Sequence, residues 1–179
     1  MDYTEIIEFW FTELKPKDHF IQSDEVDERI ADFIEVHASA KAGETEPWRE
    51  TALGALAEII VLDQFSRNLF RGSAGSFAQD TLALELAQEA VSKGYDQELL
   101  PEQRLFMYMP YMHSESKEVH THAVPLFESL GNEDTLKYEH IHKDIIDRFG
   151  RYPHRNEVLG RESTDEEVKY LAENSESFF

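Results

Sequence analysis

The chain contains no cysteine, which excludes disulfide bonds, thiolate metal sites and a cysteine nucleophile. No apolar run reaches the roughly 18 residues that a membrane-spanning helix needs. The first 14 residues carry four acids and no base, whereas a signal peptide begins with basic residues. We also find no P-loop, dinucleotide fingerprint or Gly-x-Ser-x-Gly motif. These absences favour a cytoplasmic protein, and we expect no bound cofactor.

Basic residues are scarce as well. The chain has 17 lysines and arginines against 37 aspartates and glutamates, which gives a formal net charge of -20. Nucleic acids and anionic membranes are bound by cationic surfaces. We therefore expect neither of them to be a partner.

The eight histidines are badly spaced for a metal site. His120 and His122 are two residues apart, as are His140 and His142, and residues at that spacing lie on different faces of a helix. No H-E-x-x-H motif occurs. We therefore expect no metal site. The alternative is a metal site assembled from residues far apart in the sequence, namely His113, His142, His154 and Asp63.

Hydrophobic spacing predicts helices almost throughout, and no alternating run is long enough for a strand. We expect a first helix over residues 3–14 and a second that begins at Ser23 or Asp24 and ends before Gly43. Five more should cover residues 51–65, 76–93, 101–114, 116–130 and 134–149, and a last one should begin at Ser163 or Thr164. Pro110 and Pro125 should kink or end their helices. The sequence predicts a single all-α domain over residues 1–179, with about seven to nine helices in antiparallel hairpins.

Three stretches combine charged, aromatic and histidine side chains. Asp63 and Arg67 are four residues apart at the end of an apolar helix and share a face. Either this ion pair orders the helix end, or Asp63 orients Arg67 toward a ligand. One helical face should carry four polar or aromatic residues: Arg104, Tyr108, Tyr111 and Glu115. The two tyrosines either pack in the core with their hydroxyl groups hydrogen-bonded or belong to a binding site.

Four of the nine arginines lie between Arg148 and Arg161, next to the turn formers Gly150 and Pro153 and to His154. Arginine forks with a histidine suggest a built polar site. The alternative is a structural network in which the arginines tie the last helices to the body through acids such as Asp144 and Asp147. His142 lies on the core-facing side of the helix expected over residues 134–149. It is either a hydrogen-bonded core residue or a catalytic residue.

Several long motifs resemble one bacterial family. They are LDQFSRN at 62–68, SFAQD at 76–80, EQRLFMYMPYMHSE at 102–115, FGRYPHRN at 149–156 and LGRES at 159–163. In this order they resemble the family known as domain of unknown function 924, from Phe9-Trp10-Phe11 to the last helix. Members typically have Pro at the position of Ser66 and Phe at that of Tyr152. The resemblance implies an all-helical fold similar to tetratricopeptide-type superhelices, and no established activity.

The leading hypothesis is that a polar pocket binds a small anion such as a carboxylate or phosphate. The expected ligand-binding residues are Asp63, Arg67, Asn68, Arg104, Tyr108, His113, Glu115, His142, Arg151, His154, Arg155 and Asn156. If the site performs acid–base chemistry, His154 or His113 is the proton carrier we expect. The alternative is a helical scaffold that binds a peptide or a partner protein and whose arginines are structural.

Overall fold

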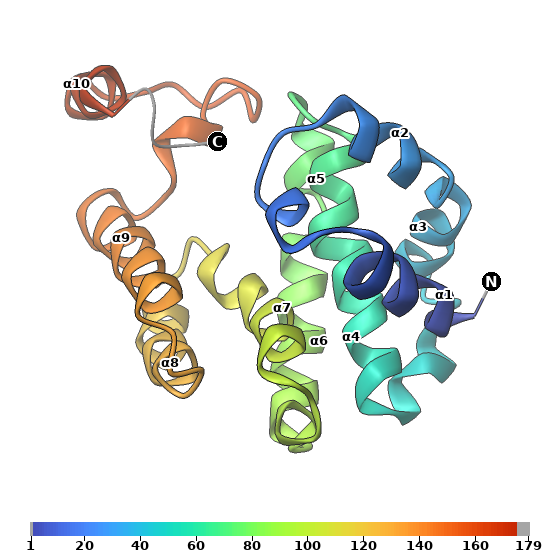
Figure 1. Ribbon diagram of the computed structural model, residues 1–179. Helices are drawn as coiled ribbons and strands as arrows, with labels where there is room; N and C mark the ends of the chain where they lie inside the picture. The colour runs from blue at the N-terminus through green and yellow to red at the C-terminus, as the bar shows by residue number, and fades with distance from the viewer. Residues whose placement is uncertain (1, 175–179) are drawn as a thin grey trace.

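The computed structural model describes residues 2–174, and within them every regular element is helical (Figure 1). The α-helices are α1 (Tyr3–Glu8), α2 (Asp24–Ala31), α3 (Ile34–Lys41), α4 (Ala52–Ile60), α5 (Ser66–Leu69), α6 (Asp80–Ser92), α7 (Pro101–Met112), α8 (Lys117–Glu128), α9 (Glu133–Phe149) and α10 (Asp165–Glu173). Two π-helical turns, η1 (Phe9–Glu13) and η4 (Val61–Phe65), extend α1 and join α4 to α5. The predicted all-α class is confirmed.

Local capping explains where several helices begin and end. Ser23 and Thr51 accept hydrogen bonds from the first turns of α2 and α4. At α10 the cap is Thr164, and Glu167 completes the capping box by accepting from the Thr164 N–H at 2.8 Å. Gly150 ends α9 in the left-handed conformation, with φ of 71°. The sequence had left open whether Ser163 or Thr164 begins this helix.

The helix expected up to Gly43 is split at Phe33, which separates α2 from α3. Phe33 leaves the helical conformation and its ring lies 4.8 Å from that of Phe9 and 5.3 Å from that of Phe65. The break therefore coincides with an aromatic contact to the core, which the helical spacing of Phe33 could not indicate.

We expected each internal proline to kink or end its helix, and neither proline ends it. α7 continues through Pro110 to Met112, and α8 continues through Pro125 to Glu128. An internal proline costs about 3 kcal/mol. Beyond Pro110, burial of Tyr111 and Met112 contributes about 1.5–3 kcal/mol for each side chain, which offsets that cost.

The helix formed by α4, η4 and α5 is the centre of the fold. Every residue from Gly54 to Ser66 is buried, whereas Thr51 and Leu53 at its start are exposed. α4 packs against α1, α6 and α7. Ser66 lies within this continuous helix; its Oγ donates to the Leu62 carbonyl at 2.6 Å and lies 2.7 Å from His37 Nε2.

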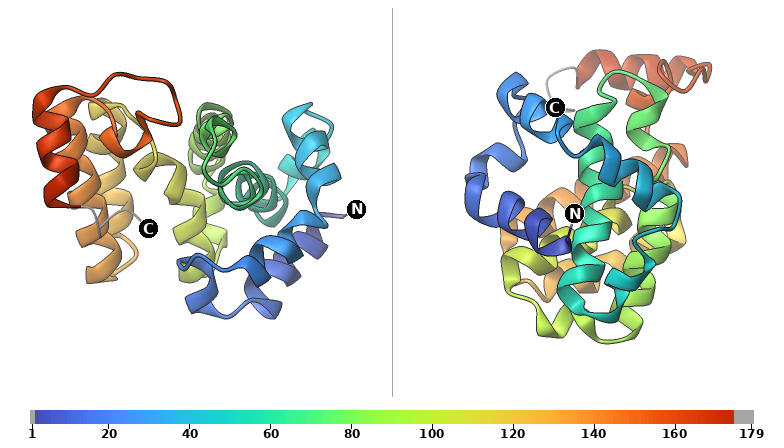
Figure 2. Two further views of the ribbon diagram at one scale, coloured as in Figure 1. Left: turned by 90° about the horizontal axis from the view of Figure 1, so that it is seen from above. Right: turned by 90° about the vertical axis from the view of Figure 1, so that its right-hand side faces the viewer.

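The remaining helices pack in chain order, α6 on α7, α7 on α8 and α8 on α9. Figures 1 and 2 show α8 and α9 side by side on one flank, α1 to α3 on the other, and α4, α6 and α7 between them. The segment after α9 turns back toward the middle of the molecule. The tetratricopeptide-like superhelix stays a prediction. Among the helices of residues 2–174, none combines the length and apolarity of a membrane span.

Candidate functional site

Asp63 lies in the π-helical turn η4, in the middle of an apolar helix, and is fully buried. Its Oδ1 lies 2.7 Å from His113 Nδ1 and 3.2 Å from Arg67 Nη1, and its Oδ2 accepts from Gln64 at 2.6 Å. Burial opposes its ionisation, but Arg67 and His113 outweigh burial and hold the pKa of Asp63 well below its usual range. π-helical turns are frequent at functional sites.

The contact with Asp63 fixes the tautomer of His113. A carboxylate only accepts, so Nδ1 is the donor. Within residues 2–174, Nε2 of His113 has no hydrogen-bond partner. The side chain is 14% exposed. This ring is therefore held in one orientation by a buried acid, which is the arrangement of a positioned base.

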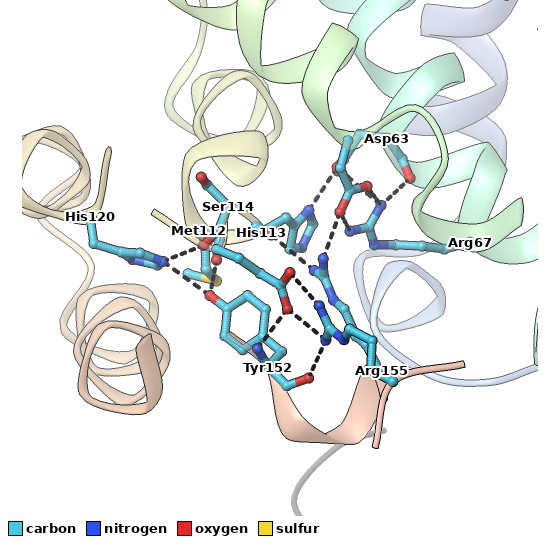
Figure 3. Close-up of polar contacts among 11 residues, drawn as sticks. Asp63, Arg67, Met112, His113, Ser114, His120, Tyr152 and Arg155 are labelled. Carbon is cyan, nitrogen blue, oxygen red and sulfur yellow. Dashed lines mark hydrogen bonds and ion pairs between the residues drawn. The ribbon is translucent and has the colours of Figure 1, made fainter. Parts of the chain in front are cut away.

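Arg67 and Arg155, both labelled in Figure 3, share the carboxylate of Asp80. Arg67 donates to both oxygens of Asp80, at 2.9 and 3.1 Å, and Arg155 donates to Oδ2 at 3.0 Å. Arg155 also donates to the His113 carbonyl at 2.9 Å. Its guanidinium lies between the rings of Phe77 and Tyr152, at 4.3 and 4.7 Å from their centroids. Burial lowers the pKa of Arg155, whose Nε is buried without a partner among the described residues.

Glu115 joins the loop after α9 to the end of α7. Its two oxygens accept from Arg161 at 2.8 and 2.9 Å, and one also accepts from the Tyr152 N–H at 2.7 Å. Burial favours the neutral acid, but these donors lower the pKa of Glu115. Arg161 donates further to Asn156 Oδ1 at 2.9 Å, and Asn156 donates to Ser163 at 3.0 Å.

Arg151 connects the same loop to α10. It donates to both oxygens of Glu167, at 2.7 and 2.8 Å, and to the Glu162 carbonyl at 2.8 Å. The hydrogen bond from Arg151 is the largest cause that lowers the pKa of Glu167, to about 2. The partners suggested by sequence, Asp144 and Asp147, are wrong, because the loop arginines pair with Glu167, Asp80 and Glu115 instead. Asp147 pairs with Lys143 on its own helix.

A buried chain of hydrogen bonds continues from Tyr152 into α8 and α9. Tyr152 Oη donates to the Met112 carbonyl at 2.5 Å and lies 3.1 Å from His120 Nε2. His120 Nε2 donates to the Ser114 carbonyl at 2.8 Å, and Nδ1 lies 2.7 Å from Glu139. His120 and Glu139 are fully buried, and burial raises the pKa of Tyr152. We had not expected either residue at the site.

Two predicted residues lie nearby with neutral side chains. His142 lies 5.6 Å from the Tyr152 ring, and its Nδ1 donates to the Tyr138 carbonyl at 2.7 Å. The ring of His154 also lies 5.6 Å from that of Tyr152. Burial lowers the pKa of His142 and of His154 to about 4. Both imidazoles are therefore uncharged at neutral pH.

Three predicted residues lie outside this region. Asn68 donates to Asp27 at 2.7 Å. Tyr108 donates to Asp96 at 2.7 Å, where burial raises its pKa, and Arg104 donates to the Leu99 carbonyl at 3.3 Å. The expected shared helical face is wrong for Glu115, because α7 ends at Met112 and Glu115 follows in a loop; Arg104, Tyr108 and Tyr111 lie within α7.

Four guanidiniums and four carboxylates thus form what we call the arginine network: Arg67, Arg151, Arg155 and Arg161 with Asp63, Asp80, Glu115 and Glu167. The charges balance. In the described part of the chain, two surface pockets are lined by residues that do not belong to the arginine network. Among residues 2–174, no three His, Asp or Glu side chains are placed to hold a metal ion together.

Comparison with known proteins gives one family. A family model described as "Bacterial protein of unknown function (DUF924)" matches residues 6–175. The chain belongs to this family. The solved structure of the protein of unknown function ATU0120 from Agrobacterium tumefaciens is similar, with a TM-score of 0.91 and 39% identity over 96% of this chain and 97% of that chain. No curated protein matches.

Proposed function

We propose that this protein is a helical scaffold that binds a peptide or a partner protein in the cytoplasm, and that the arginine network is structural. The observation that carries the proposal is the pairing of every guanidinium in the network with a carboxylate. An anion entering there would have to displace an internal acid. Breaking the most buried of these pairs, Arg155 with Asp80, should cost about 3–5 kcal/mol.

The order of packing supports the same function. From α6 to α9, each helix lies against the one that follows it in the chain. Helices that stack in chain order form extended surfaces, and proteins built this way commonly use those surfaces to bind partners. In this account the network fastens α9, the loop after it and α10 to the central helix, and so sets the shape of that surface.

A selection of displayed random peptides on the immobilised protein tests the proposal. We expect enriched peptides that bind the folded protein in solution and do not bind it in urea. In phosphate or citrate the melting temperature should equal that in sodium chloride of the same ionic strength. Failure to enrich any peptide, together with stabilisation by one of these anions, would contradict the scaffold.

A second candidate, the binding of a small anion, is favoured by one unmatched donor. Among residues 2–174, Arg155 Nε is a buried donor without an acceptor. An anion at 100 times its Kd adds about 2.7 kcal/mol of stability. For a chain of this size that raises the melting temperature by about 5–10 °C. Such a rise in wild type, absent in Arg155→Lys, would establish this candidate instead.

A further inference from the structure

A groove lies between α1 with its π-helical turn and α2. Figure 1 shows these two helices on the flank away from α8 and α9. Its volume is about 370 Å³. Its aromatic lining is Phe33 and the ring of Phe9, which is 4% exposed and covered by Arg29; the two ring centroids lie 4.8 Å apart. The polar lining is acidic and exposed, and it consists of Glu5, Glu8, Glu13 and Asp32. We call this the α1–α2 groove.

The groove already holds one cation, from the chain itself. The guanidinium of Arg29 lies 5.0 Å from the centroid of the Phe9 ring and donates to Glu13 at 2.5 Å. The Arg29 side chain is 37% exposed and that of Glu13 is 52% exposed. A pair this exposed contributes little to stability and exchanges readily with solvent. Arg29 therefore displays the contacts that an arginine from another molecule would make here.

Charge also points to a cationic occupant. Four carboxylates line the groove against the one guanidinium of Arg29, so three negative charges are in excess. At low ionic strength the net charge of -20 also attracts cationic partners from a distance and raises their association rate. Guanidinium suits this groove better than ammonium, because it is planar, stacks on aromatic rings and pairs with a carboxylate through two N–H groups.

We propose that the α1–α2 groove binds an arginine-rich peptide segment of a partner protein. One guanidinium of the partner replaces Arg29 over Phe9 and pairs with Glu13, while Glu8 and Asp32 receive a neighbouring cation. This assignment rests on the scaffold function proposed above and names its partner class. Arg29 then acts as an internal competitor, which leaves when the partner binds.

The test measures the affinity of the purified protein for a short fluorescein-labelled peptide of alternating arginine and glycine, by fluorescence anisotropy. Removing the competitor in Arg29→Gln should tighten binding about two- to five-fold, the range set by exposed ion pairs. Glu8→Gln and Glu13→Gln should weaken it by a similar factor. A lysine peptide of equal charge should bind more weakly, and a citrulline peptide, neutral but of nearly the same shape, should not bind.

Arg148→Gln is the matched control. It changes the net charge as Arg29→Gln does, but Arg148 is exposed on α9, on the other flank. It should leave the affinity unchanged, because charges beyond the Debye length of about 8 Å are screened at physiological salt. Unchanged or weaker binding by Arg29→Gln, or an equal gain in Arg148→Gln, overturns the assignment. If selected peptides still bind the protein in that case, the scaffold stands and only the groove is wrong.

Discussion

Replacement of Arg155 by alanine should destabilise the protein strongly. The side chain is 7% exposed, pairs with Asp80 at 3.0 Å, donates to the His113 carbonyl and lies between two aromatic rings. Breaking a buried pair from one side costs about 3–5 kcal/mol. Asp80 keeps both hydrogen bonds from Arg67, so its charge is not left alone. We therefore expect the lower end, about 3 kcal/mol.

Urea unfolding followed by circular dichroism measures this loss, and a thermal melt should show a fall of about 6–12 °C. Arg155→Lys keeps the charge but loses the fork and much of the ring stacking, so we expect a smaller loss of about 1–2 kcal/mol. Arg148→Ala is the control, since its pair with Glu166 is exposed and is worth about 0–1 kcal/mol. A loss below about 1 kcal/mol in Arg155→Ala, as for a surface change, would refute the reasoning.

Three further predictions concern protons, one hydroxyl and metal. His142 and His154 titrate near pH 4 when folded and near 6.5 when unfolded, so the unfolded chain takes up protons first and stability falls as pH drops from about 6.5 to 4. In the double variant His142→Asn, His154→Asn, the free energy of unfolding from urea titrations should depend less on pH in this range. An unchanged pH dependence would contradict the low pKa of these histidines in the folded protein. Tyr152→Phe removes the hydrogen bond to the Met112 carbonyl and should cost about 1 kcal/mol in urea unfolding; no cost would mean that this bond is not formed. A chelator should leave the thermal melt unchanged, whereas a large drop would reveal a structural metal.

The sequence predicted most of the fold because helices are encoded locally. Apolar spacing, the Thr164 cap and the glycine after α9 each act within a turn or two of the chain. The split at Phe33 was not predictable in this way, since it coincides with contacts to Phe9 and Phe65 that only the folded chain brings together. The continuation of α7 past Pro110 has the same origin in tertiary burial.

The arginine motifs were visible in sequence, but their partners were not. Asp80 is 75 positions from Arg155, and Glu115 is 46 positions from Arg161, so only the fold pairs them. Signals for the buried pair of His120 and Glu139 were present. His120 shares a helical face with residues 123 and 127, and Glu139 shares one with residues 142 and 146. A charged residue on a core-facing stripe predicts a buried partner.

A double-mutant cycle on Arg161 and Glu115 tests the central claim most directly, because that claim is that the arginines are committed to internal carboxylates. Arg161→Met, Glu115→Gln and the double variant are compared by urea unfolding. The two hydrogen bonds of 2.8 and 2.9 Å predict a coupling free energy of at least about 1 kcal/mol, so that the double variant loses less than both single variants together. Strictly additive losses would show that Arg161 is not bound to Glu115 in solution and would contradict the structural role of the network.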